Sequence, residues 1–170
     1  MLRISRNAVL FCLLIGLIIS SCSTPKAADV EWFGMQVSPD VWQMEEMPDG
    51  LYQHGLLTHR TLTGCQAWIM SEDPVYINGY APDSIMSFHE EFATAKTQIN
   101  LWRAKDKEGN LLQTYFEVYD ITGRTGHDLY RLAYFLVETG DDPIQCLEAV
   151  HKVIITIKPE LFPELVVAQG

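Results

Sequence analysis

Residues 99–121 read INLWRAKDKEGNLLQTYFEVYDI, two largely apolar segments on either side of the charged segment KDKEGN. The segments Ile99–Ala104 and Leu111–Ile121 contain many β-branched and aromatic residues, and Gly109-Asn110 is a turn signal between them. Two such segments joined by a short glycine-containing connection are typical of a β-hairpin. The stretch therefore predicts two antiparallel strands joined by a turn.

Shorter extended segments surround this hairpin. FGMQV at residues 33–37 alternates apolar residues with Gly and Gln, and a period of two is typical of a strand. Residues 129–138 are apolar on all sides, which fits either a helix or a strand covered on both faces, and we favour the strand. Further strands are expected at Val41–Glu45, Leu51–Thr63, Gln66–Met70 and Val75–Tyr80.

Two segments show a helical period instead. Residues 82–99 begin with Pro82-Asp83, a helix-start signal, and continue with apolar residues at three- and four-residue steps. A second helix is expected from Asp142 as N-cap, with Pro143 in the first turn, to a point before Pro159. The apolar stripes are Ile85, Phe88, Phe92, Ala95 and Ile99 in the first helix, and Ile144, Leu147, Val150 and Ile154 in the second.

The order of these elements predicts an α+β fold in which about two helices pack on an antiparallel sheet. The chain has 170 residues, a length that suits one domain, and we assign that globular domain to residues 31–170. The small polar segment 22–30 is typical of a short tether.

The first 21 residues have the pattern of an export signal. Arg3 and Arg6 precede an uncharged apolar run, Ala8–Ile19. A helix of this length rises about 18 Å, which is too short for a hydrocarbon core of about 30 Å. The run is therefore typical of the apolar region of a secretory signal rather than of a membrane span.

The segment IISSC, Ile18–Cys22, resembles the lipobox of bacterial lipoproteins. The resemblance implies that residues 1–21 are removed, that the Cys22 thiol carries a diacylglycerol and that the new α-amino group is acylated. Ser23, next to the lipidated residue, implies sorting to the outer membrane, with the domain facing the periplasm. Simple secretion with an incidental Cys22, and an uncleaved anchor, are the alternatives.

The segment FGMQVSPDVW, Phe33–Trp42, is similar to the opening of PsbP-family proteins and of certain small envelope lipoproteins. A closing C-terminal helix adds to the similarity. The resemblance implies a PsbP-like fold and an accessory or assembly role. The histidines of residues 54–59 and the cysteine at residue 65 depart from what we expect of that family.

Charge and composition restrict the possible partners. The net charge of −10 argues against nucleic-acid binding, which needs a basic surface, and against electrostatic docking on anionic lipid. We therefore expect contact with the membrane only through the N-terminal lipid, and a protein partner within the envelope.

No motif for catalysis, metal binding or a cofactor stands out. His54 and His59 are five residues apart on an expected strand, so they should face opposite sides. FHEEF at residues 88–92 lacks the second histidine of a zincin helix. His127-Asp128 are sequence neighbours, which supplies no triad geometry. We predict no metal, no cofactor and no enzymatic activity.

Two cysteines besides Cys22 belong to the expected domain, Cys65 and Cys146. An oxidising compartment favours a disulfide between them, and two buried thiols too far apart are the alternative. The function that follows is a non-catalytic, lipid-anchored binding or assembly factor. A carrier of a small apolar ligand is the first alternative, and a hydrolase built on His127 or His59 is the second.

Overall fold

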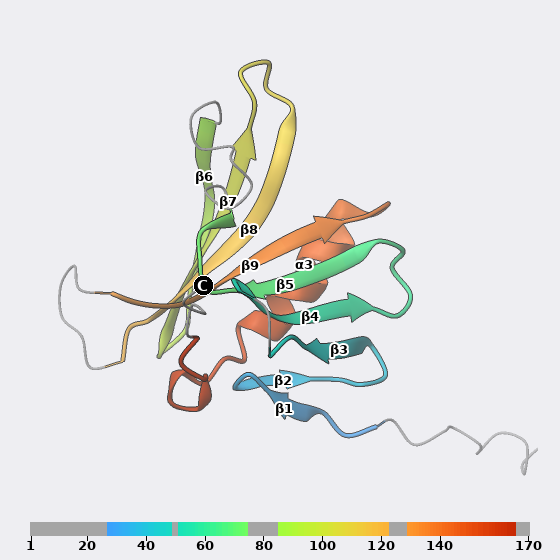
Figure 1. Cartoon of the computed structure of the whole chain (residues 1–170), viewed down its shortest axis with the longest axis vertical. Helices are drawn as coiled ribbons and strands as arrows, with labels where there is room; N and C mark the ends of the chain where they lie inside the picture. Colours follow the sequence, from blue (N-terminus) through green and yellow to red (C-terminus); the bar gives the residue numbers. More distant parts are fainter. Residues whose placement is uncertain (1–26, 49–50, 75–84, 123–128, 166–170) are drawn as a thin grey trace, which may run out of the picture.

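Nine β-strands, one α-helix and a short 3₁₀-helix make up the described part of the chain (Figure 1). The computed structural model describes residues 27–48, 51–74, 85–122 and 129–165, and for residues 85–89 it describes the backbone alone. The strands are β1 (Val30–Trp32), β2 (Met35–Val37), β3 (Trp42–Glu46), β4 (Gln53–His59), β5 (Cys65–Met70), β6 (Ile85–Ala93), β7 (Thr97–Lys105), β8 (Leu111–Asp120) and β9 (Tyr130–Thr139). The helices are α3 (Pro143–Ile154) and η1 (Pro159–Leu161).

Seven of the described strands form one sheet in the order β3-β4-β5-β9-β8-β7-β6, and β1 and β2 form a separate pair. Every pairing in both sheets is antiparallel. The strands β3 to β5 are neighbours in sequence and in the sheet, and so are β6 to β9. The two series join where β5 pairs with β9, from Cys65 opposite Thr139 to Met70 opposite Tyr134. One long-range pairing therefore makes a single sheet from two meanders.

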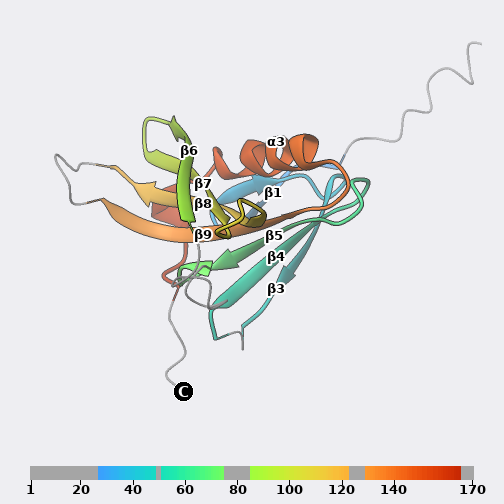
Figure 2. The same cartoon turned by 90° about the horizontal axis from the view of Figure 1, so that it is seen from above.

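The helix α3 and the β1–β2 pair lie on the same face of the sheet (Figure 2). The main apolar core lies between these layers, and the Trp32 ring sits so close to Gly55 of β4 that an added Cβ would lie 2.8 Å from it. We call the opposite face of the sheet, which no described helix covers, the helix-free face. The fully buried side chains of the main core include Met35, Val37, Leu57, Ile69, Ile99, Phe116, Phe135, Val150 and Ile154.

The α+β class, with a sheet that is antiparallel throughout, is confirmed. The hairpin predicted from residues 99–121 is also confirmed, because β7 and β8 pair from Thr97 opposite Asp120 to Lys105 opposite Leu111. Residues 129–138 form a strand, β9, as favoured. It is buried on both faces in its middle, which explains why its sequence shows no polar side.

The second predicted helix is confirmed together with its cap. Asp142 Oδ1 accepts a hydrogen bond from the backbone N–H of Gln145 at 3.0 Å, and Pro143 stands in the first turn. The side-chain amide of Gln145 donates to the other carboxylate oxygen at 2.7 Å. The helix ends at Ile154, before Pro159.

The first predicted helix, residues 82–99, is wrong. Residues 85–93 form β6, and a turn at Thr94–Thr97 leads into β7. Thr94 Oγ1 accepts from the backbone N–H groups of Lys96 and Thr97, at 3.1 and 2.9 Å, and this local bonding favours a turn over a helix. Only one described α-helix therefore packs on the sheet, instead of about two.

A β-bulge explains the misleading apolar period. The pairing of β6 with β7 shifts by one residue between Phe88 and Glu90, so the alternation of the strand changes phase there. Phe92 and Ile99, which are seven residues apart on the predicted helical stripe, face each other across the β6–β7 hairpin. The predicted strand Val75–Tyr80 and the helix start at Pro82-Asp83 lie outside the described residues.

A disulfide bond joins Cys65 at the start of β5 to Cys146 in the first half of α3. The two Cα atoms lie 5.6 Å apart, and both residues are fully buried. The bond therefore attaches the helix to the sheet at the end of the β5–β9 pairing. The disulfide closes a long loop, because the two cysteines are 81 positions apart in the sequence.

Replacing both Cys65 and Cys146 by Ala should lower the free energy of unfolding by about 4 kcal/mol, because the long loop restricts the unfolded chain. Urea unfolding of the exported wild type, both oxidised and reduced, and of the double variant measures the three free energies of unfolding. The reduced wild type should behave like the variant. Equal stability of all three samples, or two free thiols in the exported protein, would contradict it.

Two glycines meet where the β4–β5 turn touches the β9–α3 turn. Gly64 and Gly140 have φ values of +72° and +57°, and a Cβ on Gly140 would lie 2.0 Å from the carbonyl oxygen of Thr63. Backbone atoms cannot move aside as a flexible side chain can. Gly109, in the β7–β8 turn, also has a positive φ, +90°, but apart from its chain neighbours no described residue has an atom within 4 Å of its Cβ position.

Gly140→Ala should therefore destabilise the protein more than Gly109→Ala. Both substitutions place a side chain at positive φ, which costs about 1–3 kcal/mol, but only Gly140→Ala adds a backbone clash. Thermal and urea unfolding of the two variants give the comparison. Equal losses of stability would show that the close approach of the two turns is not required.

Candidate functional site

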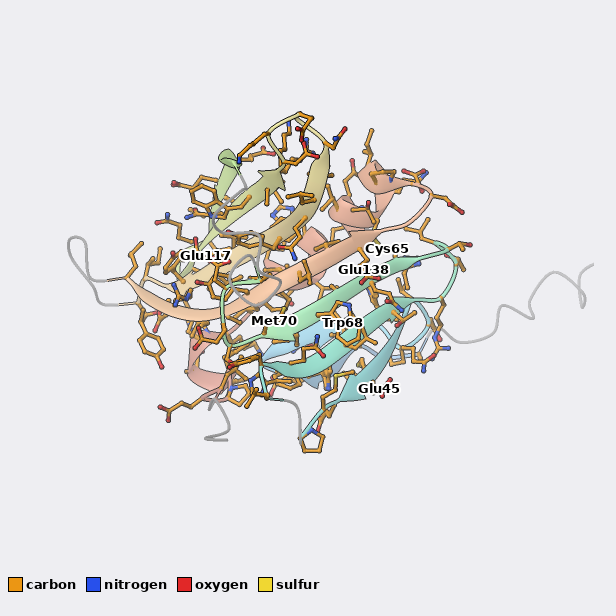
Figure 3. The ribbon with its side chains drawn as sticks, turned by 45° about the horizontal axis from the view of Figure 1, so that its top comes forward. Glu45, Cys65, Trp68, Met70, Glu117 and Glu138 are labelled. Atoms are coloured by element: carbon orange, nitrogen blue, oxygen red, sulfur yellow. A yellow bond between two sulfur atoms is a disulfide. The ribbon has the colours of Figure 1, made fainter. Side chains whose placement is uncertain are left out.

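The helix-free face carries a row of large side chains (Figure 3). The strand register places one residue from each of six neighbouring strands in this row, in the order Glu45, Leu56, Trp68, Leu136, Tyr115 and Trp102. Such cross-strand neighbours stabilise a sheet through side-chain contact. Four buried residues, Met70, Ala104, Tyr115 and Tyr134, form a second apolar cluster, with Trp68, Trp102, Leu112 and Leu136 packed partly buried against it.

A buried carboxylate, Glu117 of β8, lies beside this cluster. Glu117 is only 9% exposed. Trp102 Nε1–H donates to Glu117 Oε2 at 2.9 Å, and Arg131 Nη1 lies 3.6 Å from Oε1. The Arg131 guanidinium also lies 4.6 Å from the centre of the Tyr134 ring. These contacts hold the carboxylate and the aromatic rings in one arrangement.

Three tyrosines of the same face remain neutral phenols at physiological pH. Burial raises the pKa of Tyr115 above its ordinary value, and the nearby charge of Asp73 adds to the effect. Burial also raises the pKa of Tyr119, which bonds to Glu117, and the pKa of Tyr134. The face is therefore aromatic and hydrogen-bonding, and burial favours the neutral form of its tyrosines.

A groove of about 470 Å³ lies where β8 and β9 diverge at the edge of this face. The pairing of the two strands ends at Thr114 opposite Val137, and Figure 1 shows β8 turning away from β9 there. We call this groove the notch. Its lining residues are Gln53, Trp68, Leu111, Leu112, Gln113, Thr114, Leu136, Val137, Glu138 and Thr139.

Gln113 is an unusual member of the notch, because it is only 8% exposed and its buried Oε1 atom has no hydrogen-bond partner among the described residues. A buried acceptor without a donor costs about 1–3 kcal/mol. Most buried polar atoms in proteins are paired, so an exception needs an explanation. A ligand that donates a hydrogen bond to Gln113 Oε1 would explain this exception.

A second groove, of about 270 Å³, lies on the other face, between α3 and the strands β6 to β8. Its walls are mainly apolar, and Ile144 of α3 is 73% exposed at its rim. His151 lies between two rings, with its ring centre 3.9 Å from that of Phe92 and 6.1 Å from that of Phe116. We call this groove the helix-side groove.

A wider groove of about 630 Å³ runs between the start of β9 and the C-terminal segment. Tyr119, Tyr130 and Arg131 line one side, and Pro159, Phe162 and Glu164 line the other. Its lining mixes polar and apolar groups.

The structure describes some of the candidate residues named from the sequence and not others. Cys22 and His127 lie outside the described residues, so the lipid site and one catalytic hypothesis stay predictions. His59 Nδ1 accepts from the backbone N–H groups of Leu62 at 3.0 Å and Thr61 at 3.2 Å, which gives this atom a role in the turn after β4. Cys65 and Cys146 are brought together.

Sequence reasoning missed Gln113, Glu117, Trp68 and Glu138 as a common surface. Each one follows the alternation of its own strand, so the side it faces could be inferred once the strand was assigned. Their proximity depends on the pairing of β9 with both β5 and β8, which no local pattern shows.

Comparison with protein-family models, curated proteins and solved structures found no match. Within the described residues, no group of three or more His, Cys, Asp or Glu side chains is placed to hold a metal ion. Among those same residues, no helix has both the length and the apolar character needed to cross a membrane. The candidate site is therefore defined by the geometry of this chain.

The stability of the fold should fall as the pH falls below about 6.5. Burial lowers the pKa of His151, and the charge of Glu90 opposes this only in part, so the folded state disfavours the imidazolium. Burial lowers the pKa of His54 and His59 as well. The unfolded chain then binds more protons than the folded chain between the folded pKa values and about 6.5, so stability is lost over that window.

His151→Phe should reduce this pH dependence, because the new ring keeps the packing between Phe92 and Phe116 but does not titrate. Urea unfolding at pH 7.5 and pH 5.5 measures the change in free energy for the wild type and the variant. His54 and His59 should supply the slope that remains. An identical loss of stability in both proteins would rule out a role for His151.

Proposed function

We propose that this protein is a bacterial envelope lipoprotein whose domain binds a protein partner as an accessory or assembly factor. The lipobox resemblance at Ile18–Cys22 supports the anchor, with Cys22 as the lipidated residue and residues 22–30 as the tether. Two or three acyl chains hold a protein on a bilayer durably, whereas one chain holds it only marginally. On this proposal the domain of residues 31–170 faces the periplasm from the outer membrane.

The observation that carries the binding role is the surface of the helix-free face. Trp68, Trp102 and Leu136 are only partly buried there, and Trp68 and Leu136 also line the notch. Aromatic residues with an apolar body and a polar tip are enriched at protein interfaces. Their arrangement is rigid, because they stand on paired strands and contact a buried cluster.

A PsbP-like fold is part of the proposal at a finer level. The β1–β2 pair at the start of the domain, the antiparallel sheet and the closing helix α3 support it. The resemblance of Phe33–Trp42 to the opening of that family is its sequence basis. Accessory and assembly roles in that family accord with the binding role proposed for this chain.

The helix-side groove favours a second candidate function, transport of a small apolar ligand. Phe92, Leu101, Phe116, Ile144 and Leu147 give it an apolar lining. Its volume of about 270 Å³ is near the lower limit of about 300 Å³ for ligand pockets. Binding of a fluorescent apolar probe to the wild type, and weaker binding to Leu147→Gln, would support this candidate.

Site-specific photo-crosslinking tests the binding role in the full chain, expressed in a bacterial host. A photoreactive residue in place of Glu45 or Gln66, both on the helix-free face, should give one discrete crosslinked envelope protein. The same residue in place of Gln145, which is exposed on α3, should give none and serves as the control. Equal products from both faces, or no product from the helix-free face, would contradict the proposal.

The anchor is checked on the same purified samples. Mass spectrometry of the mature N-terminus should find a chain that begins at Cys22 with acyl groups attached. An unmodified Cys22, or a chain that still carries residues 1–21, would remove the lipoprotein assignment and leave the crosslinking result to be judged separately.

A further inference from the structure

The notch has two strand edges that no strand in the described part of the chain covers. Leu111–Gln113 of β8 pair with β7 on one side, but the ladder to β9 starts only at Thr114. Glu138 and Thr139 of β9 pair with β5 on one side, and no described strand pairs with their other edge. Backbone N–H and C=O groups along such edges are available to an added strand.

The side chains of the notch supply acceptors and an apolar surface. Gln113 Oε1 is buried and lacks a donor, and Glu138 is exposed, with no basic side chain within ion-pair distance in the described part of the chain. Trp68, Leu112 and Leu136 form the apolar part of the lining. The complementary ligand therefore carries backbone-like donors, one cationic or amide donor group, and apolar side chains.

We propose that the notch binds an extended peptide segment of a partner protein, with a Lys or Arg residue directed to Glu138. This inference rests on the proposed binding function and names its ligand class. The three residues Leu111–Gln113 extend over about 10 Å, so about three residues of the ligand align with them. The ligand adds a short strand between β8 and β9, and one of its N–H donors reaches Gln113 Oε1.

A peptide fits these features better than a glycan does. Hydroxyl groups of a sugar could pair with Gln113 and Glu138, and a sugar ring could pack on Trp68. Only a strand, however, can pair with the backbone groups of both edges through the regular hydrogen bonds of a sheet. The net charge of −10 of the chain also favours a basic ligand.

The test uses the full chain, isotope-labelled and purified in detergent micelles. The probe is a mixture of capped pentapeptides with Lys at the centre and Val, Thr or Leu at the other positions. A matched mixture has Glu at the centre. The Lys mixture should shift the backbone amide signals of Leu111–Gln113 and of Glu138 and Thr139, and the Glu mixture should shift them less.

Two charge reversals separate specific binding from general attraction. Glu138→Lys should weaken binding of the Lys mixture about three- to fivefold. Glu148→Lys changes the net charge equally, but it lies on α3 beside the helix-side groove, and it should leave binding unchanged. Gln113→Met keeps the side-chain length without the acceptor, so it should weaken binding while the protein stays folded.

Equal effects of the two charge reversals would overturn the inference. So would shifts confined to the helix-side groove, no binding of either mixture, or shifts at the notch produced by a chitin trisaccharide in place of the peptides. Crosslinking from Glu45 and Gln66 reports on the wider face. If it succeeds while the peptides fail, the proposed function stands and the peptide inference falls.

Discussion

The pairing of β5 with β9 is the interaction on which the rest of the structure depends. Six consecutive residue pairs, from Cys65–Thr139 to Met70–Tyr134, connect a meander of three strands to a meander of four. The disulfide to Cys146 and the contact of Gly64 with Gly140 lie at one end of this pairing. The helix and both meanders are therefore fixed to one another at a single corner, and a change there affects every layer.

The notch is a consequence of the same pairing. β9 follows β5 as far as Thr139, but it leaves β8 after Val137. Neighbouring strands in a sheet are twisted relative to one another by about 20–25°, so a strand that is held on one side separates from the other when their pairing ends. The gap leaves two strand edges without a described strand partner and places Gln113 in the lining of the notch, while α3 lies on the opposite face of the sheet.

Elements that depend on interactions between residues close in sequence could be predicted, and features that depend on residues far apart in sequence could not. The β7–β8 hairpin and the Asp142 cap depend on residues within a few positions of one another, and both could be predicted. The segment 82–99 could not, because a bulge after Phe88 and a turn stabilised by Thr94 reproduce a helical spacing of apolar residues. The grouping of Gln113, Trp68 and Glu138 depends on register across three strands, which a single sequence does not contain.

A weak site is sufficient for a protein that is held near its partner. The tether proposed for residues 22–30 is shorter than its nine residues, because Ala27 already donates a hydrogen bond to Asp40 at 2.8 Å and Val30 begins β1. Nine residues would span at most about 30 Å, so the proposed lipid anchor on Cys22 would keep the domain close to the membrane surface. Confinement of this kind gives effective concentrations in the millimolar range. A short strand with few side-chain contacts can then bind in a notch whose buried acceptor lowers the stability of the free protein. The unpaired Oε1 of Gln113 is thus a cost of the free state that binding would remove.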